Sequence, residues 1–243
     1  MASPLTPERR VGLTADRSQP RMGQTFYARS GKRMFDIAAS ALGLLVLSPL
    51  LVVLSGLIRL TSRGPALFLQ ERVGQGGKPF RIVKFRSMQD QHGLAQVESS
   101  NNGFAGPLIT SAEDPRITPV GRILRRFKLD ELPQLWNVLR GDMSLVGPHP
   151  EVPHYVASYS ASQGRVLTVR PGITDPASVA YRHEEDLLAG KSDPDSYYRQ
   201  VILPDKLRLN LEYLSKISFL SDLSLMLRTT SSIFTPRNRL TAR

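Results

Sequence analysis

The stretch Ile37–Ile58, IAASALGLLVLSPLLVVLSGLI, contains no charged residue over 22 positions. A helix of about 20 apolar residues is long enough to cross the hydrocarbon core of a bilayer. The stretch lies too far from the N-terminus, and is too long, for the apolar core of a signal peptide. It therefore predicts a membrane-attached helix. The alternative is an unusually apolar helix in the core of a globular domain.

Ser48-Pro49 lies at the centre of this stretch. Proline removes a backbone hydrogen bond and kinks a helix, and the Ser48 hydroxyl is a local partner for the freed backbone groups. Residues 1–33 and residues 59–88 each contain seven Lys or Arg residues, so the positive-inside rule prefers neither side. We expect a re-entrant helix over residues 31–60, broken at Ser48-Pro49, with both ends cytoplasmic. The alternative is a simple spanning helix that contains a proline.

The composition narrows the class of partner. The chain has 243 residues, and 32 Lys+Arg against 21 Asp+Glu give a net charge of +11. A strongly basic chain fits nucleic acid, anionic lipid or a phosphorylated substrate. Nucleic acid leaves the apolar stretch unexplained and no nucleic-acid motif is present, so we expect no nucleic-acid partner. Cysteine is absent, which excludes disulfides, thiolate zinc sites and a cysteine nucleophile, and the four histidines lack a metal-binding spacing.

The remaining sequence predicts a helix-rich α/β protein with a small cytoplasmic catalytic domain over residues 61–232. Thr118-Pro119 opens a basic helix whose apolar residues share one face, as in helices that lie on a membrane surface. Gly141 ends the helix that follows. The other predicted segments are a disordered basic arm (1–30), a β-hairpin (66–73 and 79–88), a polar loop (89–115), a helix (129–139), a loop (144–153), a strand and turn (165–174), a mostly helical region (197–230) and a basic tail (233–243).

The adjacent carboxylates Asp130 and Glu131 directly follow a run of cations, Arg125-Arg126-Phe127-Lys128. Nearby cations, and the N-terminus of a helix, favour the ionised form of a carboxylate. Such a carboxylate is suited to attack phosphorus, or to bind a divalent cation that holds phosphates. The alternative is a solvated Asp-Glu pair at the start of a helix.

The order of segments resembles the small monotopic phosphoglycosyl transferases, the bacterial sugar transferase family that primes polysaccharide synthesis. The resemblance covers about residues 30–232. The motifs that carry it are Lys32-Arg33-Met34-Phe35-Asp36, Ser48-Pro49, Gly64-Pro65, Gln70-Glu71-Arg72-Val73-Gly74, Lys84-Phe85-Arg86-Ser87-Met88, Leu129-Asp130-Glu131-Leu132-Pro133-Gln134-Leu135, Gly141-Asp142-Met143-Ser144-Leu145-Val146-Gly147-Pro148 and Arg170-Pro171-Gly172-Ile173-Thr174.

The resemblance implies transfer of a sugar 1-phosphate from a nucleotide diphosphate sugar, usually a UDP-sugar, to polyprenol (undecaprenyl) phosphate. It also implies that this reaction takes place at the cytoplasmic face of the bacterial inner membrane. Asp130 matches the family nucleophile and Glu131 its partner in the dyad, with Mg²⁺ bound beside them. The positions expected to neutralise substrate phosphate are Lys84, Arg86 and Arg125. The alternative is an inactive family member that acts as a membrane scaffold.

Two segments depart from the family pattern. The family commonly has Gly-Pro-Arg-Pro-Glu where this chain has Gly147-Pro148-His149-Pro150-Glu151. Histidine offers less charge than arginine at pH 7. We therefore expect His149, if it contacts donor phosphate, to bind better when protonated, near its reference pKa of about 6.5. Residues 175–179 also differ from the commonest version and indicate a donor-sugar subgroup.

Overall fold

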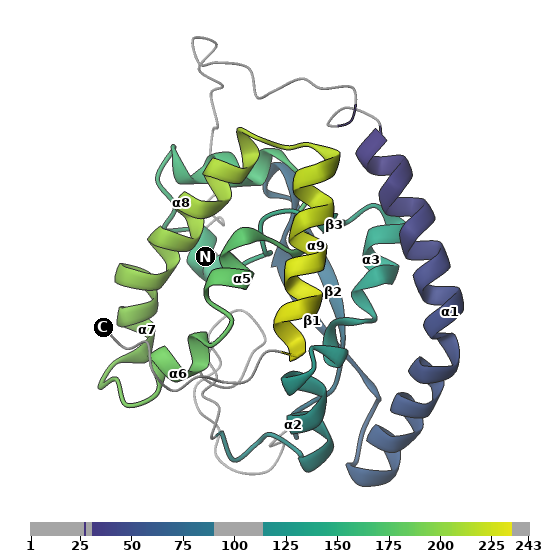
Figure 1. Cartoon of the computed structure of the whole chain (residues 1–243). Helices are drawn as coiled ribbons and strands as arrows, with labels where there is room; N and C mark the ends of the chain where they lie inside the picture. Colours follow the sequence, from purple (N-terminus) through teal and green to yellow (C-terminus); the bar gives the residue numbers. More distant parts are fainter. Residues whose placement is uncertain (1–26, 28–30, 90–113, 235–243) are drawn as a thin grey trace, which may run out of the picture.

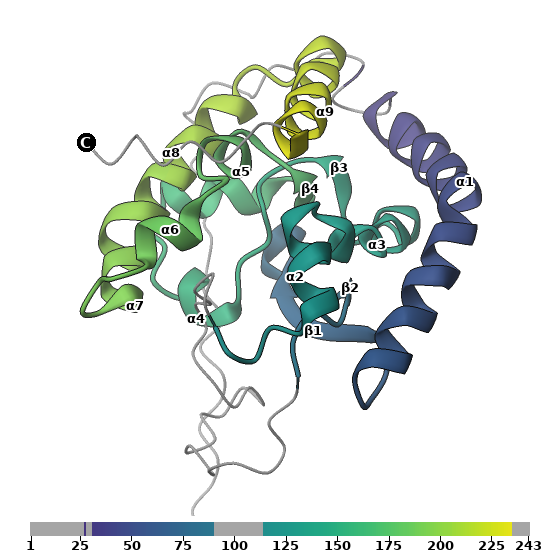
Figure 2. The same cartoon turned by 60° about the horizontal axis from the view of Figure 1, so that its bottom comes forward.

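The computed structural model describes residues 27, 31–89 and 114–234. The predicted basic arm, apart from Tyr27, lies outside these residues, as do most of the predicted polar loop (89–115) and of the predicted tail (233–243). Helix α1 flanks one side of the described part, and α6–α8 lie on the opposite side in both views (Figures 1 and 2).

Helix α1 extends from Lys32 to Thr61 and is long and apolar enough to cross a membrane. Leu45, Val46 and Val52 are 73%, 65% and 71% exposed. A core helix would hide such residues, so the interpretation of this stretch as a core helix is wrong. The exposed apolar face requires an apolar covering.

The predicted interruption at Ser48-Pro49 is absent, because α1 continues through Pro49. The helix instead bends around the rest of the protein (Figures 1 and 2). Pro49 has no N–H to donate to the carbonyl of Leu45, four residues earlier. The Ser48 hydroxyl donates to that carbonyl oxygen at 2.8 Å. Ser48 is thus the local partner that the sequence predicted, and its bond lets the helix bend without ending.

The predicted hairpin is confirmed. Strands β1 (Leu67–Val73) and β2 (Pro79–Phe85) pair antiparallel around a turn, η2 (Gln75–Gly77). A second sheet was not predicted. Strands β3 (Ser144–Val146) and β4 (Gly172–Thr174) pair in parallel, within segments predicted as a loop and as a longer strand. A Cβ on Gly172 would lie 2.1 Å from the backbone N of Gly147, so glycine permits this close approach.

The other elements are mostly short helices. Helix α2 begins as predicted, because the Thr118 side chain accepts a hydrogen bond from Gly121 N at 2.8 Å. Gly141 ends α3 with φ 100°, again as predicted. The bounds are α2 (Pro119–Arg126), η3 (Leu129–Glu131), α3 (Gln134–Arg140), α4 (Pro153–Val156), η4 (Gln163–Thr168), α5 (Pro176–Ala180), α6 (Glu184–Leu188), α7 (Pro194–Tyr197), a π-helical turn η5 (Tyr198–Ile202), α8 (Leu203–Leu214) and α9 (Phe219–Phe234).

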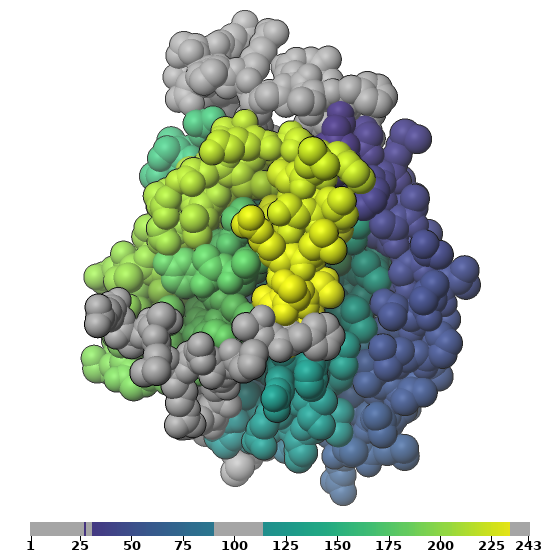
Figure 3. All heavy atoms as spheres, viewed as in Figure 1, coloured from purple at the N-terminus to yellow at the C-terminus, as the bar shows by residue number. Residues whose placement is uncertain are grey.

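The core consists of several apolar clusters rather than one. Leu54 and Ile58 of α1 pack with Phe85 of β2 and Leu124 of α2. A second cluster lies beneath α8, and a third lies between β3 and α9. Helix α9 occupies the front face between α8 and α1 (Figure 3). The inner face of α1 is therefore part of the core that supports β2 and α2.

Candidate functional site

The adjacent carboxylates lie on a single turn between two helices. Lys128 adopts a left-handed conformation with φ 56°, which ends α2 and redirects the chain into η3. Leu129, directly before Asp130, packs against the cluster formed with α1. Turn η3 also contacts β2, which brings Lys84 to the carboxylates.

Asp130 is only 8% exposed, and its Oδ1 atom is enclosed and has no hydrogen-bond partner. Burial raises the pKa of Asp130, and the negative charge of Glu131 adds to this increase. The positive charges of Lys84 and Lys128 oppose it. Burial thus changes the pKa of Asp130 more than the cations do. This differs from the expectation that the cations would keep both carboxylates ionised.

Glu131 behaves as expected. Lys84 Nζ donates to Glu131 Oε1 at 3.3 Å, and Lys128 Nζ lies 4.0 Å from the same oxygen. Burial raises the pKa of Glu131, but the charges of Lys84 and Lys128 outweigh it and hold that pKa well below its usual range. The two neighbouring carboxyls therefore have pKa values that are pushed in opposite directions, a pattern typical of active sites.

Arg86 is not among the groups that face the carboxylates. Its guanidinium donates to the carbonyl oxygens of Arg63 and Ser62 at 2.7 and 2.9 Å, and to the Ser62 hydroxyl at 2.8 Å. This geometry favours a structural role for Arg86, and its predicted binding of substrate phosphate stays a prediction. The side chain is 5% exposed and is held at the C-terminal end of α1.

Arg125 lies close enough to Asp130 for its charge to lower that residue's pKa. Its guanidinium forms an ion pair with Glu185 of α6 and lies 3.8 Å from Met88 Sδ. The three predicted phosphate-binding cations thus lie in different surroundings. Lys84 contacts Glu131, and Arg125 lies near Asp130 but is paired with Glu185. Arg86 contacts the residues that follow α1.

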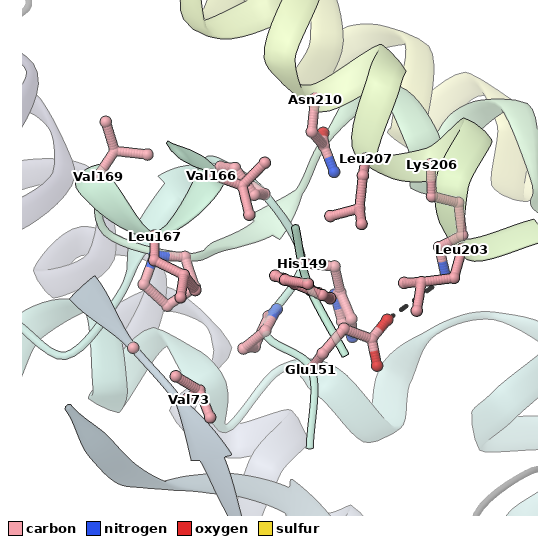
Figure 4. Close-up of a pocket in the computed structure, with 15 residues that line it drawn as sticks. Val73, His149, Glu151, Val166, Leu167, Val169, Leu203, Lys206, Leu207 and Asn210 are labelled. Atoms are coloured by element: carbon pink, nitrogen blue, oxygen red, sulfur yellow. Dashed lines mark ion pairs between the residues drawn. The ribbon is translucent and has the colours of Figure 1, made fainter. Parts of the chain in front are cut away.

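His149 follows β3 and borders a pocket (Figure 4). Its Nδ1 atom is enclosed and has no partner. Burial lowers the pKa of His149 well below its usual value, and the charge of Lys84 lowers it further. Burial therefore disfavours the protonated imidazole here, and the prediction that protonated His149 binds donor phosphate better stays a prediction.

A buried ionic network behind His149 was not found from the sequence. Lys206 Nζ of α8 lies 3.8 Å from Glu151 Oε1 and 2.8 Å from Glu184 Oε2. Figure 4 shows the first of these pairs across the pocket. Tyr198 donates to Glu151 Oε1 at 2.5 Å, and Arg72 Nη1 lies 3.9 Å from Glu151 Oε2. Glu151 and Arg72 belong to quoted motifs, but no sequence signal pairs them with α8.

A metal ion would have to use few protein ligands. Among the described residues, no group of three or more His, Cys, Asp or Glu side chains could hold a metal ion. Magnesium commonly binds one or two carboxylates and completes its shell with phosphates and water. The adjacent carboxylates of Asp130 and Glu131 are the hard oxygen donors that such a site needs, so these residues fit Mg²⁺.

The chain is similar in sequence to known proteins. A family profile described as "Bacterial sugar transferase" matches residues 27–236. The chain is 39% identical over 218 residues to "UDP-glucose:undecaprenyl-phosphate glucose-1-phosphate transferase" of Caulobacter vibrioides. The aligned region covers 85% of this chain and 71% of that protein.

Two further relatives are longer proteins. One is "UDP-N-acetylgalactosamine-undecaprenyl-phosphate N-acetylgalactosaminephosphotransferase" of Aeromonas hydrophila, 39% identical over 175 residues, with 69% of this chain and 38% of that protein covered. The other is "Undecaprenyl-phosphate glucose phosphotransferase" of Komagataeibacter xylinus, 38% identical over 213 residues, with 85% and 36% covered. The chain thus spans little more than a third of these two relatives.

Proposed function

The chain belongs to the bacterial sugar transferase family, and we propose that it transfers a sugar 1-phosphate from a nucleotide diphosphate sugar to undecaprenyl phosphate or a similar polyprenol phosphate. The names of three relatives each contain undecaprenyl phosphate and a sugar. The observation that carries the proposal is the buried Asp130 beside Glu131, with Lys84 and Lys128 around the pair. The donor is most simply a UDP-sugar, as in two of those names.

The proposed reaction has two displacements at one phosphorus atom. A carboxylate oxygen of Asp130 bonds to the phosphorus that carries the sugar. The bond from that phosphorus to the bridging oxygen breaks, and the nucleoside monophosphate leaves with that oxygen. A phosphate oxygen of the polyprenol phosphate then attacks the same phosphorus. The bond to Asp130 breaks, which restores the carboxylate and releases the polyprenol diphosphate sugar. Covalent catalysis divides one difficult step into two easier ones.

The cations around the dyad neutralise the charge that develops on the phosphates. Glu131 forms ion pairs with Lys84 and Lys128 and so keeps both cations beside Asp130. Glu131 itself takes no part in the bond changes. Mg²⁺, held by Asp130 and Glu131, supplies additional charge neutralisation when bound. The ionised Glu131 orients cations, whereas Asp130 provides the reacting oxygen.

The exposed face of α1 supports a membrane location for the reaction. Its leucine and valine side chains match the hydrocarbon core of a bilayer. A polyprenol acceptor stays in the bilayer, so the dyad must lie at the interface. We propose that α1 enters the cytoplasmic face of the bacterial inner membrane, bends at Ser48-Pro49 among the membrane lipids, and returns to the same side.

The test is a panel of UDP-sugars supplied to the purified chain with undecaprenyl phosphate and Mg²⁺. We expect one or more donors to release nucleoside monophosphate and to leave a phosphosugar on the protein when the acceptor is omitted. Asp130→Asn should neither release nucleoside monophosphate nor carry a phosphosugar. The control is Glu71→Gln, which makes the same acid-to-amide change at an exposed carboxylate of β1 and should retain both activities. Absence of release from every donor by the wild-type chain would overturn the proposal.

A further inference from the structure

Helix α6 carries two adjacent carboxylates that pair with different parts of the protein. Glu184 Oε2 lies 2.8 Å from Lys206 Nζ of α8, which also lies 3.8 Å from Glu151 Oε1. Glu185 forms an ion pair with Arg125, in the last turn of α2. Helix α6 therefore connects the buried ionic network to the helix that leads into the dyad.

The ion pair of Arg125 and Glu185 lies within electrostatic range of the proposed nucleophile. Burial is the main influence on the pKa of Asp130, and the charge of Arg125 acts against it. Glu131 is the main cause of the raised pKa of Lys128, and the charge of Glu185 adds to it. A diphosphate that reaches Asp130 therefore also comes within range of this ion pair.

Arg125 has hydrogen-bond donors that the ion pair does not use. Its Nη2 group donates to Glu185, whereas Nη1 lies 3.8 Å from Met88 Sδ, and a thioether is a weak acceptor. A guanidinium has five N–H groups in a rigid plane. The side chain is 23% exposed, so an anion from solution can reach it. Glu185 can therefore hold one part of the guanidinium while another part binds a phosphate oxygen.

The residues on both sides of Glu185 are anchored. Glu184 is paired with Lys206, whose side chain is only 11% exposed. Leu188, at the other end of α6, is buried in the apolar cluster beneath α8, and Figure 2 shows α6 beside α8. A carboxylate supported in this way restricts a long, flexible arginine before the substrate arrives, which lowers the entropy cost of binding an anion.

We propose that Glu185 is a positioning residue that holds Arg125 beside Asp130, so that the remaining N–H groups of Arg125 bind the diphosphate of the donor. The inference rests on the proposed function and extends the site to α6, which none of the sequence motifs includes. The opposite role would be competition, in which Glu185 occupies Arg125 and repels the diphosphate. The two roles predict opposite changes in donor affinity when Glu185 is replaced.

The test is single-turnover labelling of the protein over a range of concentrations of a sugar-labelled UDP-sugar. Glu185→Ala removes the acceptor and should raise the donor concentration for half-maximal rate by about 5-fold, the upper range for a partly exposed ion pair. Glu185→Gln keeps an acceptor oxygen and should give a smaller increase. Both variants should change the maximal rate less, because Glu185 touches no reacting atom. Glu212→Ala breaks another exposed Arg–Glu pair, on α8, and should alter neither quantity.

A double-mutant cycle tests whether Glu185 acts through Arg125. In an Arg125→Met background, Glu185→Ala should have no further effect on the half-saturating donor concentration. Equal or tighter donor binding by Glu185→Ala alone would overturn the inference and leave the proposed function intact, and so would an equal loss in the Arg125→Met background. A wild-type chain that no donor labels would instead refute the proposed function. Rates are expressed per folded molecule, so a variant that folds poorly still gives a result.

Discussion

Substitution of Arg86 by Met should weaken the fold and leave the binding of donor intact. The side chain extends from the end of β2 to the last residues after α1, where its guanidinium donates three hydrogen bonds to Ser62 and Arg63. Ser62 caps α1 and Arg63 follows it, so the buried guanidinium satisfies carbonyls directly after the C-terminal end of the helix.

The magnitude follows from these three hydrogen bonds. At about 1 kcal/mol net for each bond, Arg86→Met loses about 3 kcal/mol. For a chain of this size, 1 kcal/mol lowers the unfolding temperature by about 2–4 °C, so we expect a decrease of about 6–12 °C. A Cβ on Gly64, whose φ is +114°, would lie 2.1 Å from Arg86 Nη1. Gly64→Ala should therefore act in the same direction, and the double variant should lose less than the sum.

The assay compares thermal unfolding with donor affinity, both in the same detergent or nanodisc preparation. Lys84→Met is the counterpart, because Lys84 contacts Glu131 and should lose turnover as its main effect. Arg86→Met that unfolds at the wild-type temperature but has lost its affinity for donor would refute the reasoning. That result would restore the phosphate-binding role that the sequence motif suggested.

Three further predictions concern the nucleophile, the membrane helix and the histidine. Asp130→Asn should abolish phosphosugar labelling without changing membrane association; labelling near the wild-type level would exclude Asp130 as nucleophile. Pro49→Ala restores a helix position that proline disfavours by about 3 kcal/mol. It should expose part of the N-terminal arm on the non-cytoplasmic side of the membrane. Because the chain has no cysteine, a single cysteine introduced into the arm reports its side by labelling; labelling from the cytoplasmic side only would contradict the prediction. His149 has a folded-state pKa far below its unfolded value of about 6.5, so stability is lost as pH falls below about 6.5. His149→Gln should flatten the decrease in unfolding temperature between pH 7 and 5, and an unchanged slope would contradict the prediction.

Features encoded by neighbouring residues were predictable. The hairpin at η2, the cap formed by Thr118 and the end of α3 at Gly141 each depend on a few adjacent residues. The same is true of Ser48, whose hydroxyl bonds to a carbonyl three residues earlier. What the sequence overestimated was the effect of Pro49, because that one side-chain bond compensates for the missing N–H and the helix continues.

Features that join distant segments were not predictable. The parallel pairing of β3 with β4 depends on Gly147 and Gly172, which are 25 positions apart. Lys84 and Arg86, two positions apart, were both predicted to neutralise substrate phosphate. In the structure Lys84 meets Glu131 on η3, whereas Arg86 meets the end of α1. No local pattern separates these roles, because each is decided by what packs against β2.

The inner face of α1 is tied to the catalytic domain at both ends. Near its start, Arg33 donates to the carbonyl oxygens of Val138 and Leu139 at 2.6 and 3.0 Å, and Asp36 accepts from Leu145 N at 3.0 Å. At its other end, Arg86 holds the carbonyls that follow the helix. A change in the membrane topology of α1 would therefore have to break the contacts at one of its ends.

The same helix supports the residue that precedes the nucleophile. Leu54 and Ile58 of α1 form a cluster against which Leu129 packs, and Leu129 directly precedes Asp130. The position of the carboxylate relative to α1 is thus set by side-chain packing and not by a flexible linker. If α1 enters the membrane as proposed, the height of Asp130 relative to the lipid is fixed by the same contacts. Deletion of α1 would therefore disrupt the catalytic domain as well as its attachment, which is why single substitutions such as Pro49→Ala are the cleaner test of membrane topology.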